Sequence, residues 1–219
     1  MVKASTPKSI ATRAKLVAVA ERLFAERGVD GVSLSEINKA SGQRNANACQ
    51  YHFGTREGLL QAIVDKHVPG IAVRRDALLD QLAADNGETI AGLTDALVLP
   101  VVEKLHDPDG GDCFIRVNAQ LIDRHMLAYF NDGVGELTAP GQARFVATIN
   151  RVLSGIPRGL RQQRLHFASI LLFHGLADHS RLQERLIGAN EQINEHFVVR
   201  TLRDSIYAIL AAPHVEQST

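Results

Sequence analysis

The sequence predicts an all-α fold, with an N-terminal three-helix domain that carries a helix-turn-helix over residues 1–54 and a C-terminal domain of antiparallel helices over residues 55–219. Three observations support this prediction. Apolar residues recur at helical spacing along most of the chain, and no segment alternates with the two-residue period of a strand. Short stretches rich in Gly, Pro and Asn separate the helical segments.

The composition is that of an ordinary globular protein, with 45% hydrophobic and 22% charged residues in a chain of 219. Its two cysteines, Cys49 and Cys113, lack the spacing of a zinc site or a disulfide framework. The N-terminus does not resemble a signal peptide, and no apolar run approaches the ~20 residues that span a bilayer. We therefore expect a cytoplasmic protein that does not bind a membrane.

The charges sum to zero but are unevenly distributed along the chain. Residues 1–67 contain ten Lys and Arg against six Asp and Glu, an excess of four. The remaining residues carry the matching acidic excess. A basic first third suits a module that faces phosphate groups, although a difference of this size also arises by chance.

The first predicted helix begins at Lys8, because Thr6 is a good N-cap and Pro7 favours the first helical position. It should end at Gly28. Two further short helices complete the N-terminal domain. Their shared core is expected to contain Leu16, Ala20, Leu23, Phe24, Leu34, Ile37, Cys49 and Phe53.

A capping box, Ser33-x-x-Glu36, predicts that the second helix begins at Leu34, and Gly42 should end it. After a turn, Asn45 can cap a third helix over residues 46–52. This helix is too polar to be buried, because amide and polar aromatic side chains replace the apolar ones of a core helix. Such a pair of helices is what a helix-turn-helix presents to the major groove.

The exposed side chains of the third helix have the chemistry of DNA recognition. Asn47 and Gln50 can pair with adenine edges, while Tyr51 and His52 can donate to phosphate oxygens. The following helix should begin with Thr55 as its cap, which places Arg56 beside the same surface. The alternative is a capped pair of helices with no nucleic-acid partner.

The C-terminal domain continues as helices predicted over about residues 89–105, 112–127, 138–154, 158–185 and 190–211. Before them, Val68-Pro69-Gly70 should bend or interrupt the first long helix. The run Leu165 to Leu176 is apolar nearly all round, which requires burial on more than one side. We therefore expect a homodimer through the last two helices, the alternative being the core of a monomer.

Polar residues on apolar helical faces indicate where a small molecule could bind. Two faces combine core residues with an amide or an imidazole, and a pocket with apolar walls and a few polar anchors is a usual ligand site. The candidate ligand-binding residues are Phe114, Asn118, Leu121, His125, Phe167, Ile170 and His174. Each polar residue among them could instead be satisfied within the core.

The chain carries one motif with the spacing of a metal site. Glu103 and His106 have the Glu-x-x-His spacing of di-iron bundles, but the further carboxylates that such a site needs are missing. The chain lacks GxSxG, HExxH and phosphate-binding glycine loops. We expect no catalytic residues, metal or cofactor, and a helical metal-binding enzyme is a distant alternative.

Motifs between Thr12 and Leu60 resemble those of the TetR family of bacterial transcriptional regulators. The matching residues are Thr12-Arg13, Ala20, Leu23-Phe24-Ala25-Glu26-Arg27-Gly28, Ser33-Leu34, Ile37, Ala40-x-Gly42, Tyr51-His52-Phe53 and Arg56-Glu57-x-Leu59-Leu60. The turn is one residue longer than the common pattern. With Phe53 as the anchor, the resemblance implies DNA contacts by Ser33, Arg44, Asn45, Ala46, Asn47, Gln50, Tyr51, His52, Thr55 and Arg56, with the role of Arg44 left open.

The resemblance further implies a homodimer that binds a near-palindromic double-stranded DNA operator. It implies repression until a small-molecule effector enters the C-terminal domain and separates the two DNA-binding heads. An activator, or a repressor controlled by a protein partner, is the nearer alternative.

Overall fold

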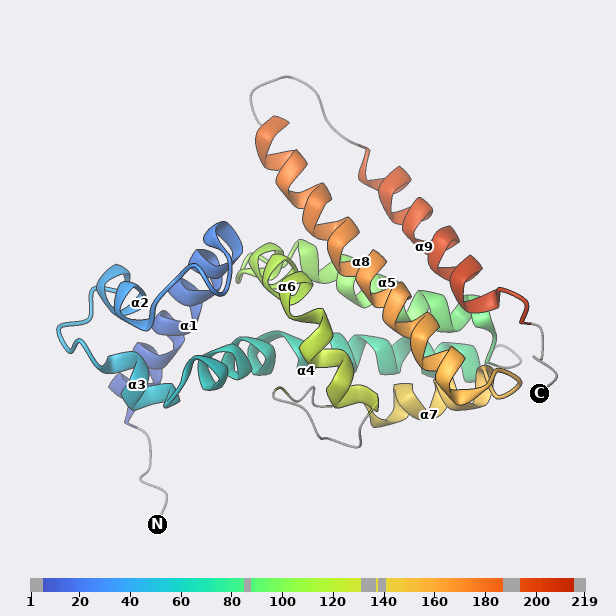
Figure 1. Cartoon of the computed structure of the whole chain (residues 1–219), viewed down its shortest axis with the longest axis horizontal. Helices are drawn as coiled ribbons and strands as arrows, with labels where there is room; N and C mark the ends of the chain where they lie inside the picture. The colour runs from blue at the N-terminus through green and yellow to red at the C-terminus, as the bar shows by residue number, and fades with distance from the viewer. Residues whose placement is uncertain (1–5, 85–87, 131–136, 138–140, 187–193, 215–219) are drawn as a thin grey trace, which may run out of the picture.

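The computed structural model describes residues 6–84, 88–130, 137, 141–186 and 194–214, with the side chains of residues 123–130 left out. All regular structure in these ranges is helical, which confirms the predicted fold class. The helices are α1 (Pro7–Arg27), α2 (Leu34–Ala40), α3 (Ala48–Phe53), α4 (Arg56–Ala84), α5 (Ile90–Leu105), α6 (Gly111–Phe130), α7 (Ala143–Val152), α8 (Arg158–Leu186) and α9 (Glu195–Ala211). Figure 1 shows α1–α3 as a small head at one end and α5–α9 as a bundle at the other, with α4 running between them.

The helix-start signals act as the sequence predicts. Thr6 Oγ1 accepts a hydrogen bond from the Ser9 amide at 3.3 Å, and Pro7 occupies the first turn. At the start of α2, the Ser33 side chain accepts from the Glu36 amide while the Glu36 carboxylate accepts from the Ser33 amide. Both contacts satisfy backbone donors that a helix start leaves without partners.

Helix α3 begins at Ala48, two residues later than predicted, and Asn45 is not its N-cap. Asn47 occupies the N-cap position, and its side chain makes no capping bond. Asn45 Oδ1 instead accepts from the Asn47 amide at 3.0 Å within the turn. The longer turn therefore uses Asn45 as a local turn former, which Asn does readily because its side chain can imitate a backbone carbonyl.

Helix α4 continues through Pro69, so of the predicted bend or interruption the interruption is wrong. Residues on both sides of the proline are buried, including Val68 and Ile71. Packing on both sides outweighs the cost of the missing backbone donor. As a result, one helix of 29 residues reaches from the head into the bundle.

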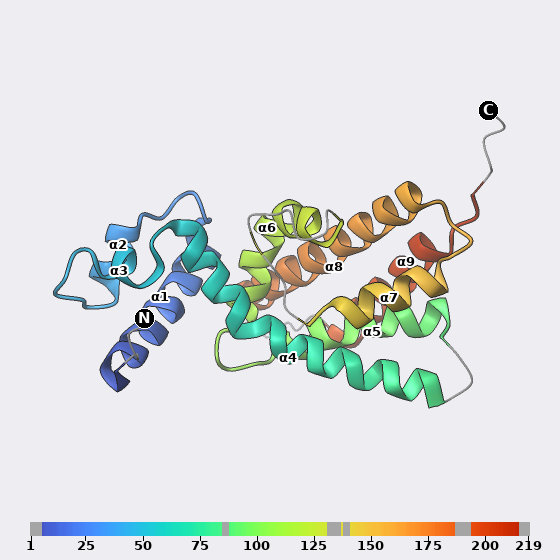
Figure 2. The same ribbon diagram turned by 90° about the horizontal axis from the view of Figure 1, so that it is seen from below.

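The bundle is organised around α6 and α8, which contact one another extensively, with α9 packed on α8 and α5. Figure 2 shows the molecule from below, where α4 lies along α5 and α7. The cores of the head and the bundle are continuous through the buried residues of α4, among them Leu59, Leu60 and Ile63. The helices of the described ranges include none that is long and apolar enough to cross a membrane.

Candidate nucleic-acid interface and helical-domain cavity

The outward face of α3 carries the amides and the ring predicted to contact DNA. Asn47 and Gln50 are exposed, and Tyr51 is 77% exposed. His52 is half-buried, and its ring meets that of Tyr51 edge-on at 5.1 Å between centroids. The opposite face holds Cys49, which is fully buried. The helix is therefore held by a small apolar face while its polar side chains point to solvent, the arrangement that base-edge contact requires.

Asn38, a residue that was not among the predicted site residues, fixes α3 against α2. It is 3% exposed. Its amide nitrogen donates to the carbonyl of Ala46, and its Oδ1 accepts from the Cys49 amide at 2.9 Å. One side chain thus bonds to a backbone carbonyl just before α3 and to a backbone amide in its first turn. The sequence carries one indication of this role, since Asn38 is a polar residue directly after the core residue Ile37.

The remaining predicted DNA contacts lie around α3. Arg44, Asn45 and Ala46 are exposed in the turn before it, and Arg44 makes no hydrogen bond or ion pair with another described residue. Thr55 is exposed and accepts from the Gly58 amide at 3.1 Å, as a cap of α4. Ser33 serves the capping box described above.

Arg56 has an internal contact that the sequence did not predict. Its Nη1 donates to the carbonyl of Val29, and the side chain is half-buried. The guanidinium therefore ties the start of α4 to the turn between α1 and α2. A phosphate contact would have to use its other donors, because each guanidinium carries five.

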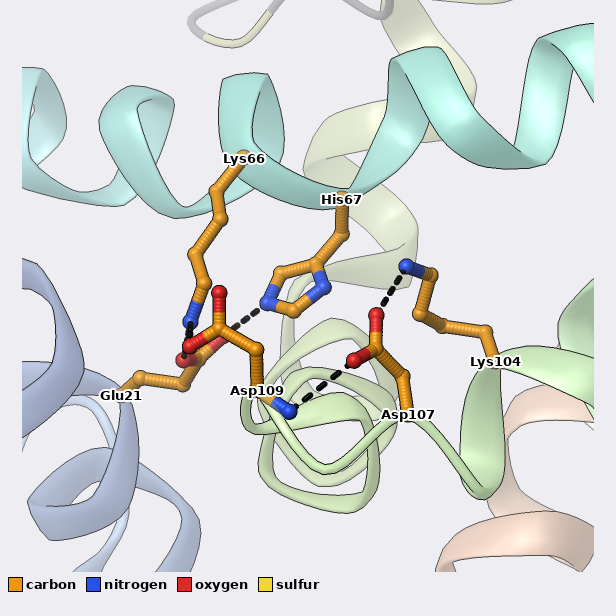
Figure 3. A network of polar contacts seen from close by, with 6 residues as sticks. All are labelled: Glu21, Lys66, His67, Lys104, Asp107 and Asp109. Carbon is orange, nitrogen blue, oxygen red and sulfur yellow. Dashed lines mark hydrogen bonds and ion pairs between the residues drawn. The ribbon is translucent and has the colours of Figure 1, made fainter.

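A buried polar joint connects the head to the bundle (Figure 3). Glu21 of α1 is 1% exposed, and its two oxygens contact Lys66 Nζ at 2.9 Å and His67 Nε2 at 2.5 Å. Lys66 also pairs with Asp109, in the α5–α6 turn, at 3.0 Å. Burial lowers the pKa of Lys66, but its bonds to the two carboxylates outweigh this effect and raise the pKa above its ordinary value.

A second contact joins α6 to the end of α1. Gln120 Oε1 accepts from the Val29 amide at 2.9 Å, and its Nε2 donates to the Phe24 carbonyl at 3.3 Å. Both groups lie where α1 ends at Gly28, whose φ is +86°. Movement of α6 would therefore be transmitted directly to the backbone of the head.

A cavity of about 460 Å³ lies inside the bundle between α4, α5, α6, α7 and α8. It is lined by Val68, Ile71, Arg75, Leu97, Val101, Phe114, Asn118, Ile122, Gln142, Phe145, Val146, Ile149, Asn150, Arg158, Arg161, Gln162, Leu165, Ser169 and Phe173. This volume lies within the range of small-molecule sites. Two predicted ligand-binding residues, Phe114 and Asn118, line it.

The other candidates whose side chains are described do not line this cavity. Leu121 is buried in the core, and the side chain of His125 lies outside the described residues. On α8, Phe167 is 52% exposed, His174 is exposed, and Ile170 packs at the edge of the core. The face of α8 that does line the cavity carries the set Leu165, Ser169 and Phe173. Since this helix is apolar nearly all round, its sequence did not indicate which face turns inward.

Residues 16–63 match the family model described as bacterial regulatory proteins, tetR family. The resemblance to the TetR family is thereby confirmed. The matched segment covers most of α1, all of α2 and α3, and the start of α4, so it coincides with the TetR-type head that presents the polar face of α3. DNA binding by this head and a role in transcription regulation are what the family description supports.

Two solved structures align with most of the chain. One is a protein assigned as a TetR-family transcriptional regulator from Rhodococcus sp., with 15% identity, a TM-score of 0.41, and coverage of 91% of this chain and 98% of that one. Another is RolR in complex with resorcinol, with 20% identity, a TM-score of 0.41, and coverage of 95% and 97%. No curated protein sequence matches the chain.

Proposed function

We propose that the protein is a TetR-type transcriptional repressor that binds a near-palindromic operator as a homodimer and is released by a small molecule in the bundle cavity. The observation that carries this proposal is the physical link between its two sites. The exposed polar face of α3 lies at one end of a continuous core and the cavity at the other, with Glu21 and His67 between them. This layout supports a division into a DNA-binding domain, residues 1–54, and an effector and dimerisation domain, residues 55–219.

The exposed apolar surface of α8 and α9 supports dimerisation. On α8, Phe167 is 52% and Leu182 44% exposed, and on α9, Phe197 is 64% and Tyr207 45% exposed. These helices are neighbours, and an apolar surface that they expose together would be a usual mark of a protein interface. A two-fold axis through this surface would form a four-helix bundle and supply a second α3 for the other half of the operator.

Coupling between cavity and DNA would use α4 and α6. Phe114 lines the cavity and stacks on His67, whose Nε2 contacts Glu21 of the head. A ligand that displaces Phe114 would therefore shift His67 and Glu21, and with them the position of α1. The spacing of the two α3 helices in the dimer would change as a result. By linkage, DNA must weaken ligand binding by the same factor.

Selection of bound fragments from the source genome with purified full-length protein tests this function. We expect enrichment of a near-palindromic sequence, and an operator–protein complex whose mass corresponds to two chains or a multiple of two. A transcription assay on the recovered promoter should show less transcript when the protein is added. Absence of any enriched sequence, or a monomer on the operator, would contradict the proposal, and increased transcript would indicate an activator.

A further inference from the structure

The described lining of the cavity is charged, and its charge has one sign. Arg75, Arg158 and Arg161 line it, and its described lining contains no Asp or Glu. Neutral polar groups come from Asn118, Gln142, Asn150, Gln162 and Ser169. A ligand that enters this cavity meets a positive potential, which a neutral or cationic molecule cannot use.

Arg75 is held rigidly in the wall. It is 5% exposed, its Nε donates to the Ala96 carbonyl at 2.9 Å, and its guanidinium lies 4.3 Å from the centre of the Phe145 ring. It also donates to Gln142. Because contacts with α5 and α7 fix its orientation, the charge is positioned before a ligand arrives, which reduces the entropic cost of binding.

Two further arginines lie in the first turns of α8. Arg161 Nη1 donates to the carbonyls of Leu153 and Ile156 at 3.1 and 3.4 Å. Arg158 is exposed and makes no hydrogen bond or ion pair with another described residue. The start of a helix adds a partial positive charge to theirs. This end of the cavity therefore has donors suited to an anionic group.

The rest of the cavity is mostly apolar. Along α8, Leu165, Ser169 and Phe173 continue the face that begins with Arg158, and Phe173 lies about 18 Å along the helix axis from Arg161. Phe114 and Val68 complete the end of the cavity that lies opposite the arginines, toward the head. One polar anchor lies on α6, where Asn118 is 6% exposed and makes no hydrogen bond to a described residue.

We propose that the cavity selects an amphipathic organic anion, a monocarboxylate on an apolar body. The carboxylate binds at the arginine end beside α7 and the start of α8, and the body extends toward Phe114 and Phe173. Arginine suits this role because its donors match a carboxylate in paired geometry. This inference rests on the proposed function, since it specifies the effector of the same cavity.

Calorimetric titration of the full-length protein with matched probes tests the charge selection. The probes are decanoate and 1-decanol, 4-phenylbutyrate and 4-phenyl-1-butanol, and the decyltrimethylammonium cation, all below their micellar concentrations. We expect at least one carboxylate to bind about tenfold or more tightly than its alcohol, since the charge contributes hydrogen bonds that the alcohol lacks. The cation should bind most weakly. The two carboxylates distinguish a linear acyl body from an aryl one.

Variants assign the effect to the arginine end. Arg158→Gln should lower carboxylate affinity about threefold to tenfold and leave alcohol affinity unchanged, and adding Arg161→Gln should reduce the discrimination further, with Arg75 as the remaining charge. Arg185→Gln is the matched control, because Arg185 is exposed on the same helix and does not line the cavity. Equal binding of acids and alcohols, preference for the cation, no binding of either carboxylate, or unchanged discrimination in the double variant would overturn the proposal.

An operator-release assay with the same probes separates this inference from the proposed function. If alcohols bind as well as acids and release the operator, ligand-released repression stands and the charge selection is wrong. If carboxylates bind selectively but the operator remains bound, the charge selection stands and release by a ligand of this cavity is wrong.

Discussion

The imidazole ring of His67 is stacked on the phenyl ring of Phe114, with ring centroids 4.6 Å apart. Phe114 belongs to the cavity wall, and His67 belongs to the joint with the head. Among the described residues His67 Nδ1 has no hydrogen-bond partner, so the ring is oriented by Phe114 on one side and Glu21 on the other. This short chain of contacts provides a route by which cavity occupancy affects the head.

Glu21→Gln should weaken the coupling between ligand and operator. The substitution keeps the shape of the side chain but removes the charge that pairs with Lys66. We expect unchanged ligand affinity in the absence of DNA, because Glu21 does not line the cavity. The ratio of ligand affinities without and with operator should fall by about threefold to tenfold, within the usual range of coupling energies.

Titration with and without operator measures this ratio. Glu26→Gln is the control, because Glu26 is exposed on the same helix and makes no hydrogen bond or ion pair with a described residue. An unaltered ratio in the Glu21 variant would show that the joint does not transmit the signal.

Gly110→Ala should destabilise the protein by about 1–3 kcal/mol. Gly110 has a φ of +83°, and an added Cβ would lie 2.5 Å from Glu21 Oε2, inside the joint. Gly54→Ala is a matched control, since Gly54 has a φ of +73° and its Cβ would meet nothing within 4 Å. Urea denaturation of both variants measures the difference. Equal free energies of unfolding would mean that the joint is looser than its geometry indicates.

Asn47→Ala and Gln50→Ala should relax operator choice at individual base pairs. Each removes an exposed amide of α3, and the loss of a base-edge pairing costs about 1–3 kcal/mol. Folding should be unaffected because neither side chain is buried. Gel-shift series on single-base operator variants measure the discrimination. If both protein variants keep full sequence specificity, the residues that contact the bases lie elsewhere.

Asn38→Ala should lower stability by about 1–3 kcal/mol and weaken binding to every operator sequence. It leaves a backbone carbonyl and a buried amide without the partner that now holds α3 in place. Lys39→Ala, at the exposed neighbouring position, should change stability far less. Thermal denaturation and gel shifts report the two effects, and normal operator affinity in Asn38→Ala would contradict the positioning role.

Acid should weaken the start of α2. The Ser33 amide, Arg27 and the Ser33 hydroxyl hold the pKa of Glu36 at about 2, below the ordinary 4.5. A lowered folded pKa adds stability above pH 4.5 that is lost as the pH falls toward 2. Glu36→Gln should therefore be less stable than the wild type at pH 7, and the difference should disappear near pH 2. A difference that persists at pH 2 in denaturation curves would contradict this cause.

Local signals predicted much of the head correctly. The cap at Thr6, the capping box at Ser33 and the glycine ends at Gly28 and Gly42 depend on residues within four positions of one another. The helical spacing of apolar residues likewise predicted which helix faces are buried in the head. Because these interactions are local, they can be read directly from the order of residues.

Other features depended on contacts between distant residues. The start of α3 is set by Asn38 from the preceding helix, and the head is joined to the bundle by Glu21 and Lys66, 45 positions apart. On α8, only packing against α6 determined that Phe173 faces the cavity while Phe167 faces outward. The sequence by itself determined the helical fold class, the caps of α1 and α2 and the polar face of α3. The tertiary structure alone decided which faces meet, because a helix that is apolar on several sides is compatible with more than one orientation until its neighbours are in place.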